Sequence, residues 1–544
     1  MTTQQFAAGA GVTDAFHVYD TTLRDGAQGE GMALTVADKL AIAKHLDDLG
    51  VAFIEGGWPG ALPKDTEFFA RAQSELKLRH AQLVAFGSTR KAESKASEDP
   101  QVLALRDSGA GTICLVAKSH VGHVERALRT TLAENLAMIT DTVTFLRSEG
   151  RRVFVDCEHF FDGYHLDPAY ALDVVRTAAA AGADVVVLCD TNGGMLPSRV
   201  KQVVTEVLAA TGARLGIHCQ DDTGCAVANT IAAVEAGATH VQCVANGYGE
   251  RTGNANLATV IGNLQLKMGI QCLPEGKLKE LARVSHAIAE ISNMTPRHHL
   301  PYVGMSAFAH KAGLHASAIK VDPDLYQHID PTLVGNDMRM LISEMAGRAS
   351  VELKGKELGH DLTVNPQALA NVVEKVKSLE ARGYSFEAAD GSFDLLIRSE
   401  LDPENSKAFE LESWRVIVDR DASGEVKTEA TVKLHAFGKR FVATGEGNGP
   451  VNALDMALRQ GLEQVYPDLA RLELVDFKVR IVEGAHGTGA IVRVLVETTD
   501  GETEWDTVGV HENIIEASWQ ALADAVTYGL LRGAESETGL DSVS

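Results

Sequence analysis

The chain has 544 residues, of which 45% are hydrophobic and 23% charged, as in ordinary globular proteins, and this length suits roughly three domains. The net charge of −24 argues against nucleic acid or an anionic membrane as a general partner. No apolar run approaches the length of a membrane span, and the N-terminal stretch MTTQQFAAGAGVTDAF lacks the basic start and apolar core of a secretory signal, so we expect a cytoplasmic protein.

A repeating pattern runs through residues 17–246. In four segments a helical pattern ends at a glycine and an apolar strand follows: LDDLGVAFIEGG, LRDSGAGTICLV, AAAAGADVVVLCD and AVEAGATHVQCV. The glycines, at positions 50, 109, 182 and 237, suit the left-handed conformation past a helix C-terminus. Further strands are predicted at HVYDTT, QLVAFGS, RVFVDCE and RLGIHCQ. Eight strand–helix units in about 250 residues predict an α/β fold, a TIM (β/α)8 barrel over residues 1–275.

The strands are continuous apolar runs, which is expected when both faces of a parallel sheet are buried. An open, doubly wound sheet is the alternative, but no G-x-G-x-x-G follows the first strand. Several of the seven cysteines lie inside these strands, their count is odd, and no close pair has zinc-finger spacing. We therefore expect buried free thiols in a reducing compartment.

The second half of the chain follows two other patterns. Residues 276–390 are mainly helical, as in KLKELARVSHAIAEISN and LANVVEKVKSLEARG, and predict a helical linker subdomain. Over residues 391–535 two helical segments accompany four strands, WRVIVDR, TEATVKLHAFG, FKVRIVE and AIVRVLVETTD, and predict an α+β domain. The tail, residues 536–544, is expected to be disordered.

Polar side chains gather where the predicted barrel strands end, and TIM-barrel active sites lie at this end. The segments concerned are DTTLRDGAQ, IEGGWPG, DCEHFFDGY, CDTNGG, HCQDD and NGYGERTGNANL. They supply Arg24, Asp25, Gln28, Glu55, Glu158, His159, Asp190, Thr191, Asn192, His218, Gln220, Glu250, Arg251 and Asn254.

Asp25, His218, Gln220 and Asn254 form a candidate divalent-metal site. Strand alternation sends His218 and Gln220 to one face, whereas the two aspartates that follow suit a helix cap. A carboxylate, an imidazole and two carboxamides suit Mg²⁺ or Mn²⁺ better than Zn²⁺. Arg24 is placed to oppose a developing oxyanion. Each residue alone is more often a cap, a loop anchor or a salt-bridge partner, but their convergence at one barrel end favours a site.

The motifs DTTLRDGAQ, IEGGWPG and GERTGNANL, with the histidine of the seventh strand, resemble the DRE-TIM metallolyase family. Its members include 2-isopropylmalate, homocitrate and citramalate synthases and hydroxymethylglutaryl-CoA lyase, and the synthases share the three-part layout. EGGWPGALPKDTEFF and EHFFDGYHLDPAYAL look most like the citramalate synthase branch. The resemblance implies condensation of acetyl-CoA with pyruvate for isoleucine synthesis, with 2-isopropylmalate or homocitrate formation as the alternative.

The resemblance also implies roles for particular residues. Arg24 and Glu55 match the family's name-giving residues and are expected in catalysis, as are His315 and Tyr326, which reach the partner subunit's barrel. For the base that removes a proton from the acetyl group, His315 and Glu158 are the two candidates. Thr191 matches a residue that contacts the 2-oxo acid, and Asp25, His218 and Asn254 match metal ligands. Arg24 and Gln28, at the end of the first strand, are further candidates for substrate contact. From the residues alone, His315 reads as an ordinary loop histidine.

One position departs from the family pattern. The fourth ligand is usually a histidine in H-x-H-N-D, and here Gln220 stands in its place. A glutamine offers a carbonyl oxygen, which hard cations accept, so the exchange disfavours zinc. Alternatively, Asp221 or Asp222 takes over, or a water fills the position. A chain that has lost catalysis and only senses an amino acid is a further alternative.

The C-terminal domain contains a glycine-rich turn that opens a helix, TGEGNGPVNALDMAL at residues 444–458. Such a turn can hold a carboxylate at the helix N-terminus, or it can simply serve the fold. In the related synthases this domain binds an amino-acid end product and dimerises. The resemblance thus implies a homodimer inhibited by isoleucine, with Gly445, Gly447, Asn448 and Gly449 as candidate contacts.

Overall fold

The computed structural model describes residues 14–482 and 489–540, with side chains to residue 533, and divides into two compact units. The first unit runs to Phe308 and includes Ile329–Asp337, and the second holds Ala309–His328 and continues from Met338. The segment predicted as a helical linker is therefore divided between the two units. The three-domain division of the chain stays a prediction.

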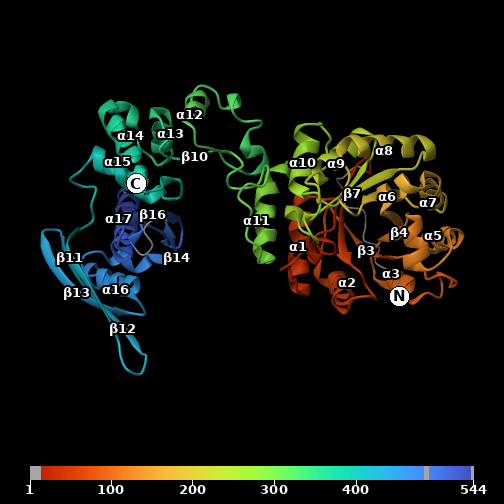
Figure 1. Cartoon of the computed structure of the whole chain (residues 1–544), viewed down its shortest axis with the longest axis horizontal. Helices are drawn as coiled ribbons and strands as arrows, with labels where there is room; N and C mark the ends of the chain where they lie inside the picture. The colour runs from red at the N-terminus through yellow and green to blue at the C-terminus, as the bar shows by residue number, and fades with distance from the viewer. Residues whose placement is uncertain (1–13, 483–488, 541–544) are drawn as a thin grey trace. The chain divides into compact units, whose positions relative to one another are not determined.

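Eight parallel strands close into a barrel in the order β1 to β8 (Figure 1). The strands are β1 His17–Asp20, β2 Phe53–Gly57, β3 Gln82–Ser88, β4 Thr112–Lys118, β5 Arg152–Glu158, β6 Val185–Asp190, β7 Leu215–Cys219 and β8 His240–Cys243. β1 pairs with both β2 and β8, with His17 opposite His240, and this pairing closes the ring. The predicted TIM barrel and its eight strands are confirmed.

Helices return the chain from one strand to the next and surround the barrel (Figure 1). They are α1 Val36–Leu49, α2 Pro63–Glu75, α3 Pro100–Asp107, α4 Val121–His123, α5 Leu132–Ser148, α6 Phe160–Leu166, α7 Pro168–Ala180, α8 Pro197–Thr211, α9 Ala226–Glu235, α10 Leu257–Leu266 and α11 Leu281–Ile291. At the end of α1, Gly50 has a φ of 94° and donates its N–H to the carbonyl of Leu46. The three other glycines predicted at helix ends also have positive φ.

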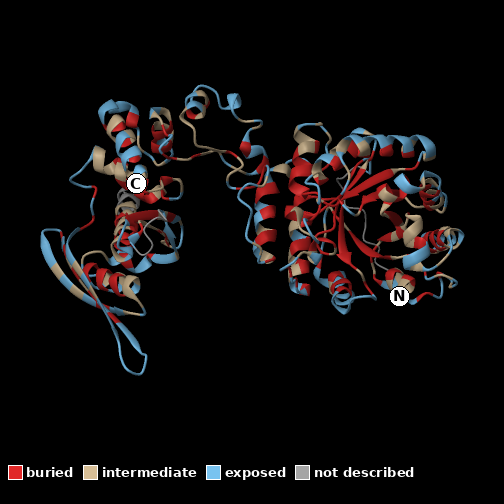
Figure 2. Cartoon of the chain, viewed as in Figure 1, coloured by how far each residue is buried: buried red, intermediate tan, exposed pale blue. Residues whose placement is uncertain are grey.

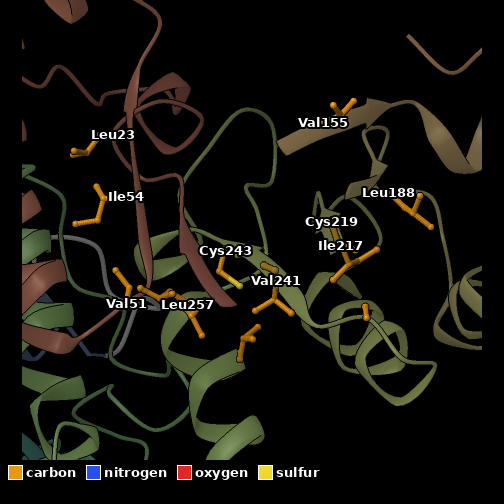
Figure 3. Packing of buried hydrophobic residues seen from close by; sticks show 14 of the residues in the cluster. Leu23, Val51, Ile54, Val155, Leu188, Ile217, Cys219, Val241, Cys243 and Leu257 are labelled. Carbon is orange, nitrogen blue, oxygen red and sulfur yellow. The ribbon is translucent and has the colours of Figure 1, made fainter. Parts of the chain in front are cut away.

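The strands of the barrel are buried almost throughout (Figure 2). Their apolar side chains form one cluster on each face of the sheet. One cluster fills the space between strands and helices, and Figure 3 shows part of it. A second cluster fills the barrel interior, where Phe53 and Phe154 pack edge to face with ring centroids 5.0 Å apart. Along β5, Phe154 belongs to the interior cluster and Val155 to the outer one, so alternate residues face the barrel axis.

The second unit begins with short elements and four helices. Two-residue strands, β9 Ala309–His310 and β10 Arg339–Met340, pair in parallel. The helices are α12 Gly313–Ile319, α13 Arg348–Glu357, α14 Pro366–Ala381 and α15 Asp390–Leu401. An apolar cluster joins α14 and α15 to Val508 and Val510 of the following sheet, so these helices share a core with the C-terminal domain.

Two successive β-β-β-α segments complete the unit. The first has β11 Glu410–Arg420, β12 Val426–Ala436, β13 Lys439–Gly447 and α16 Pro450–Leu462. The second has β14 Glu473–Ile481, β15 Val492–Thr499, β16 Glu504–His511 and α17 Ile514–Leu540. Each segment forms a three-stranded antiparallel sheet whose helix packs against it. The predicted α+β fold is confirmed.

Three details of this domain differ from the sequence-based expectation. β13 and β16 were not among the four predicted strands, because glycines and charged residues interrupt their apolar pattern. α17 continues to Leu540, into the tail expected to be disordered, because Ala and Glu after Gly533 favour helix. Residues 541–544 of that tail lie outside the described residues.

The structure also bears on two expectations about the whole chain, one about its cysteines and one about membrane-spanning helices. All seven cysteines are free, and six of them are buried, as predicted. Within residues 14–482 and 489–540, no helix is both long and apolar enough to cross a membrane.

Candidate active site at the C-terminal end of the barrel

The structure brings the four predicted metal ligands together. The Nε2 atom of His218 lies 3.1 Å from Oδ2 of Asp25, and the Nε2 of Gln220 donates to the same oxygen at 3.1 Å. The Nε2 atoms of Gln220 and His218 are 3.4 Å apart. Asn254 joins the group through its backbone, and none of the four residues is more than 7% exposed. They form one buried cluster, hereafter the Asp25 cluster.

Backbone pairing at the end of β7 positions two members of this cluster. His218 lies on β7, and Gln220, two residues later, forms an isolated antiparallel bridge with Asn254. The flanking hydrogen bonds run from the N–H of Asp221 to the carbonyl of Gly253 at 2.8 Å, and from the N–H of Ala255 to the carbonyl of Cys219 at 3.1 Å. The loop after β8 is thereby tied to the end of β7.

The aspartates that follow Gln220 have other partners. Asp221 accepts the N–H of Ala226 at 2.8 Å, at the first turn of α9. Asp222 pairs with Arg251 at 2.8 Å on the surface, and Arg251 also donates to the backbone carbonyl of Thr191 at 3.0 Å. These contacts fit the cap and loop-anchor interpretation of the two aspartates.

Arg24 stands between two carboxylates beside the Asp25 cluster. Its Nε donates to Oε1 of Glu55 at 2.5 Å, and its Nη1 lies 3.4 Å from Oδ1 of Asp25. The guanidinium also lies over the ring of Phe86, 3.8 Å from the centroid. Such a cation, held on two sides and stacked on a third, is preorganised to face an anionic group.

Glu55 is fully buried and accepts from three donors. Besides Arg24, the hydroxyls of Thr21, at 2.7 Å, and Tyr19 donate to its carboxylate. With its oxygens occupied in this way, Glu55 acts on the site by orienting Arg24. A role in direct contact with substrate stays a prediction.

The charges within the Asp25 cluster stabilise one another. Burial by itself raises the pKa of Asp25, but the charge of Arg24 and hydrogen bonds from His218 and Gln220 outweigh it, so the pKa lies well below the usual range. Burial lowers the pKa of His218, and the hydrogen bond to Asp25 more than offsets that effect, so the pKa is raised. Asp25 is therefore an ionised carboxylate with capacity to bind a cation.

The donor set fits a hard divalent cation. The amide oxygens of Gln220 and Asn254 are buried and have no hydrogen-bond partner. The Nδ2 of Asn254 is already bonded to the carbonyl of Tyr248 at 3.1 Å. Among the described residues no group of three or more His, Cys, Asp or Glu side chains is placed to hold a metal ion, so the carboxamides are needed to complete this donor set. One carboxylate, one imidazole and two free amide oxygens match the preferences of Mg²⁺ and Mn²⁺.

The other predicted barrel residues lie at the ends of β1, β5 and β6. Glu158 ends β5 and forms an ion pair with Lys118, whose pKa is lowered by burial. The Thr191 hydroxyl accepts the N–H of His159 at 2.8 Å. Gln28 lies in the short helix η1 Gly26–Gln28, with its side chain exposed. The roles predicted for Glu158, Thr191 and Gln28 stay predictions.

His315 and Tyr326 belong to the second compact unit. Their rings stack with centroids 4.0 Å apart and an interplanar angle of 28°, so the structure brings these two predicted residues together. His310 lies edge-on to His315 at 6.1 Å.

The glycine-rich turn of the C-terminal domain has a clear packing role. A Cβ on Gly445 would lie 2.4 Å from the backbone nitrogen of Ala457, and one on Gly447 would lie 2.5 Å from Oδ1 of Asn452. These two glycines thus let β13 lie close against α16. By contrast, a Cβ on Gly449 would meet no atom within 4 Å. The predicted effector contacts of Gly445, Gly447, Asn448 and Gly449 stay a prediction.

Sequence reasoning missed three residues that support the site from inside the barrel: Tyr19, Asp156 and Gln242. Gln242 contacts His218, Asp156 contacts Gln242, and Tyr19 contacts Glu55. Burial raises the pKa of Asp156 to about 6, with a further increase from the charge of Glu55, so its carboxylate is ionised at pH 7 and above. The available signal was an isolated polar residue in an apolar strand, as in VFVDC and HVQC.

Comparison with known protein families divides the chain into three matched segments. The HMGL-like model matches residues 15–288, the homocitrate synthase post-HMGL domain-like model matches residues 302–384, and the LeuA allosteric (dimerisation) domain model matches residues 387–530.

Curated relatives cover nearly the whole chain. An (R)-citramalate synthase of Streptomyces coelicolor is 70% identical, over 95% of this chain and 97% of the relative. An (R)-citramalate synthase of Synechocystis is 48% identical, over 94% and 96% of the two chains. A probable 2-isopropylmalate synthase of Methanopyrus kandleri is 31% identical, over 94% and 98%.

A closed TIM barrel with a buried carboxylate–imidazole–carboxamide cluster at the C-terminal ends of its strands defines an enzyme of the HMGL-like class. Within that class, the high identity to (R)-citramalate synthases along nearly the full length of the chain identifies the family. The chain belongs to the (R)-citramalate synthase family, and the resemblance inferred from its motifs is confirmed.

Proposed function

We propose that this enzyme condenses acetyl-CoA with pyruvate and hydrolyses the resulting thioester, giving citramalate and free CoA. The observation that carries the proposal is the buried Asp25 cluster beside Arg24, in a chain 70% identical to an (R)-citramalate synthase. Pyruvate presents a keto oxygen and a carboxylate, which suit a cation and an arginine placed side by side.

Asp25, His218, Gln220 and Asn254 would hold the cation, Mg²⁺ or Mn²⁺ rather than Zn²⁺. When bound, such an ion acts as a Lewis acid on the keto group of the 2-oxo acid. The free amide oxygens of Gln220 and Asn254 support this assignment. The Nε2 of Gln220 now faces Asp25, so Gln220 must rotate its carboxamide to offer its oxygen.

Arg24 would stabilise the negative charge that forms on the keto oxygen during carbon–carbon bond formation. Its position is supported by Glu55 and Phe86, so little reorganisation is needed when the charge appears. Thr191, after β6, and Gln28, after β1, would contact the 2-oxo acid from two different strand ends.

Glu158 would remove a proton from the acetyl methyl group, and the resulting carbanion would add to the keto carbon of pyruvate. Its carboxylate, at the end of β5, forms an ion pair with Lys118, which holds it in place at the C-terminal end of the barrel. His315 and Tyr326, stacked on each other, would act from the second unit on the partner subunit's barrel. Water then hydrolyses the citramalyl thioester, and CoA leaves as the thiol.

We further propose a cytoplasmic homodimer that serves isoleucine synthesis and is inhibited by isoleucine. The LeuA allosteric (dimerisation) domain match at residues 387–530 supports assembly and feedback, and the seven free cysteines support a reducing compartment. Isoleucine would place its carboxylate at the start of α16, near Asn448 and Gly449.

Release of CoA thiol with a panel of 2-oxo acids tests the reaction. We expect pyruvate to be used fastest, and removal of divalent cations with a chelator to abolish turnover. Arg24→Gln should lower kcat by about 100-fold or more, whereas Arg106→Gln, which changes a surface ion pair, should leave it unchanged. Faster turnover of 2-oxoisovalerate than of pyruvate would contradict the substrate assignment.

Isoleucine in the same assay tests the regulation. Gly449→Leu adds a side chain at the start of α16, where a Cβ meets open space, and should relieve inhibition without changing the uninhibited rate. Isoleucine binding by a chain with no turnover for any 2-oxo acid would instead identify a catalytically inactive sensor.

A further inference from the structure

Four buried polar side chains form a continuous chain of contacts through the barrel interior. The Nε2 of Gln242 donates to Oδ1 of Asp156 at 2.8 Å, and the Oε1 of Gln242 lies 2.7 Å from Nδ1 of His218. His218 in turn meets Asp25 through its other nitrogen at 3.1 Å. None of the four residues is more than 6% exposed, so water does not compete for these contacts.

The contact with Asp156 determines which way the Gln242 carboxamide points. An ionised carboxylate only accepts hydrogen bonds, so Gln242 must turn its NH₂ group toward Asp156. The other contact of that NH₂ group within the described part of the chain is a weak one, with Sγ of Cys114 at 4.0 Å. The carbonyl oxygen of Gln242 is therefore left facing His218.

The carbonyl oxygen of Gln242 in turn determines the tautomer of His218. A carbonyl only accepts, so Nδ1 of His218 must carry a hydrogen to complete the 2.7 Å bond. With a hydrogen fixed on Nδ1, the nitrogen left to exchange its hydrogen for a cation is Nε2, the atom beside Asp25 and Gln220. Ring orientation and tautomer are thus both set from inside the barrel.

We infer that Gln242, oriented by Asp156, is the positioning residue that prepares His218 to bind the divalent cation. This inference rests on the proposed cation site. Gln242 does not touch the cation or the substrate; it holds the His218 ring in one plane, with Nε2 turned toward Asp25 and Gln220. Histidine ligands in metal sites commonly need such a partner on the second nitrogen, and its loss weakens metal binding about 10- to 100-fold.

Mn²⁺ titration of the full chain without substrates, followed by the electron paramagnetic resonance signal of free Mn²⁺, tests this role. Gln242→Met keeps the volume but removes the acceptor, and we expect its Mn²⁺ affinity to fall about 10- to 100-fold. Asp156→Asn should weaken binding in the same direction but less, because an asparagine no longer dictates the Gln242 orientation. Thr112→Val, which removes a buried hydrogen bond to Gln82 at the start of β4, is the matched control and should bind normally.

A second readout separates positioning from general damage. In ¹⁵N-histidine NMR spectra, the His218 signal is assigned as the one missing from His218→Asn. In the native chain this signal should show a hydrogen on Nδ1, and in Gln242→Met it should show a mixture of the two tautomers. If Gln242→Met binds Mn²⁺ as tightly as the native chain while His218→Asn does not, the positioning role is refuted and the cation site stands. If His218→Asn also binds normally, the proposed cation site itself is wrong, and this inference falls with it.

Discussion

The contact between Glu55 and Arg24 gives the most direct test of how this site is built. Glu55→Gln keeps the shape of the side chain but removes the charge from a carboxylate that accepts from Tyr19, Thr21 and Arg24. Hydrogen bonds to a charged acceptor are roughly twice as strong as neutral ones and contribute about 1.5–3 kcal/mol each. In Glu55→Gln the bond from Arg24 is weaker, and the NH₂ end of the glutamine cannot accept a hydrogen from one of the two hydroxyls. Together these two losses should lower the free energy of unfolding by about 2 kcal/mol. Glu55→Ala, which leaves the arginine charge buried and unpaired, should cost about 3–5 kcal/mol.

The assay combines unfolding with kinetics. Trp58 is the one tryptophan among the residues described for the barrel unit, and it packs edge-on to Phe86, 5.4 Å between centroids. A urea titration that follows Trp58 fluorescence, corrected with a Trp58→Phe background, reports barrel unfolding. Release of Arg24 should also lower kcat by about 100-fold. Glu67→Gln, which affects an exposed ion pair, is the control. A Glu55→Gln enzyme with native midpoint and kcat would refute the idea that Glu55 holds Arg24.

Three further predictions concern other parts of the chain. Gln220→His should raise affinity for Zn²⁺ relative to Mn²⁺ by about tenfold or more; unchanged preference and rate would show that residue 220 does not contact the cation. Burial lowers the pKa of His17 from 6.5 to about 4, so its contribution to stability is full above pH 6.5 and falls by about 3 kcal/mol as the pH drops toward 4. In His17→Asn, the urea midpoint should therefore depend less on pH between 6.5 and 4 than in the native chain. An equally steep pH dependence of the midpoint in the variant would contradict this. Gly445→Ala should destabilise the second unit by about 2 kcal/mol through its clash with Ala457, whereas Gly449→Ala should be near neutral in thermal unfolding.

The barrel was predictable because its signals are local and repeated. A glycine with positive φ followed by an apolar run marks the passage from helix to strand, and Gly50 and Gly182 behave as expected. Strand alternation also placed His218 and Gln220 on one side, and the structure has both side chains reaching Asp25. These inferences needed only sequence spacing and the rule that parallel strands present their carboxyl ends together.

Other features depend on contacts between residues far apart in the sequence. Asp156 and Gln242 each look like a lone polar residue in an apolar strand, and only the barrel closure brings them within hydrogen-bond distance. Likewise, the role of Glu55 as a support for Arg24 depends on β1 and β2 being neighbours. In the C-terminal domain, β13 lacks a clear apolar alternation because its glycines serve the packing of α16.

The pairing of β1 with β8 has a consequence for how the protein is made. Asp25 follows the first strand of the barrel and Asn254 follows the last, so the Asp25 cluster spans the seam where the two ends of the barrel sequence meet. A nascent chain that has emerged only as far as β7 holds Asp25 and His218 but has no partner strand for β1 on that side. A cation bound to the completed cluster would join the first strand to the last, and its binding free energy would add to that of barrel closure. Metal supply during synthesis would then influence the yield of folded enzyme as well as its rate.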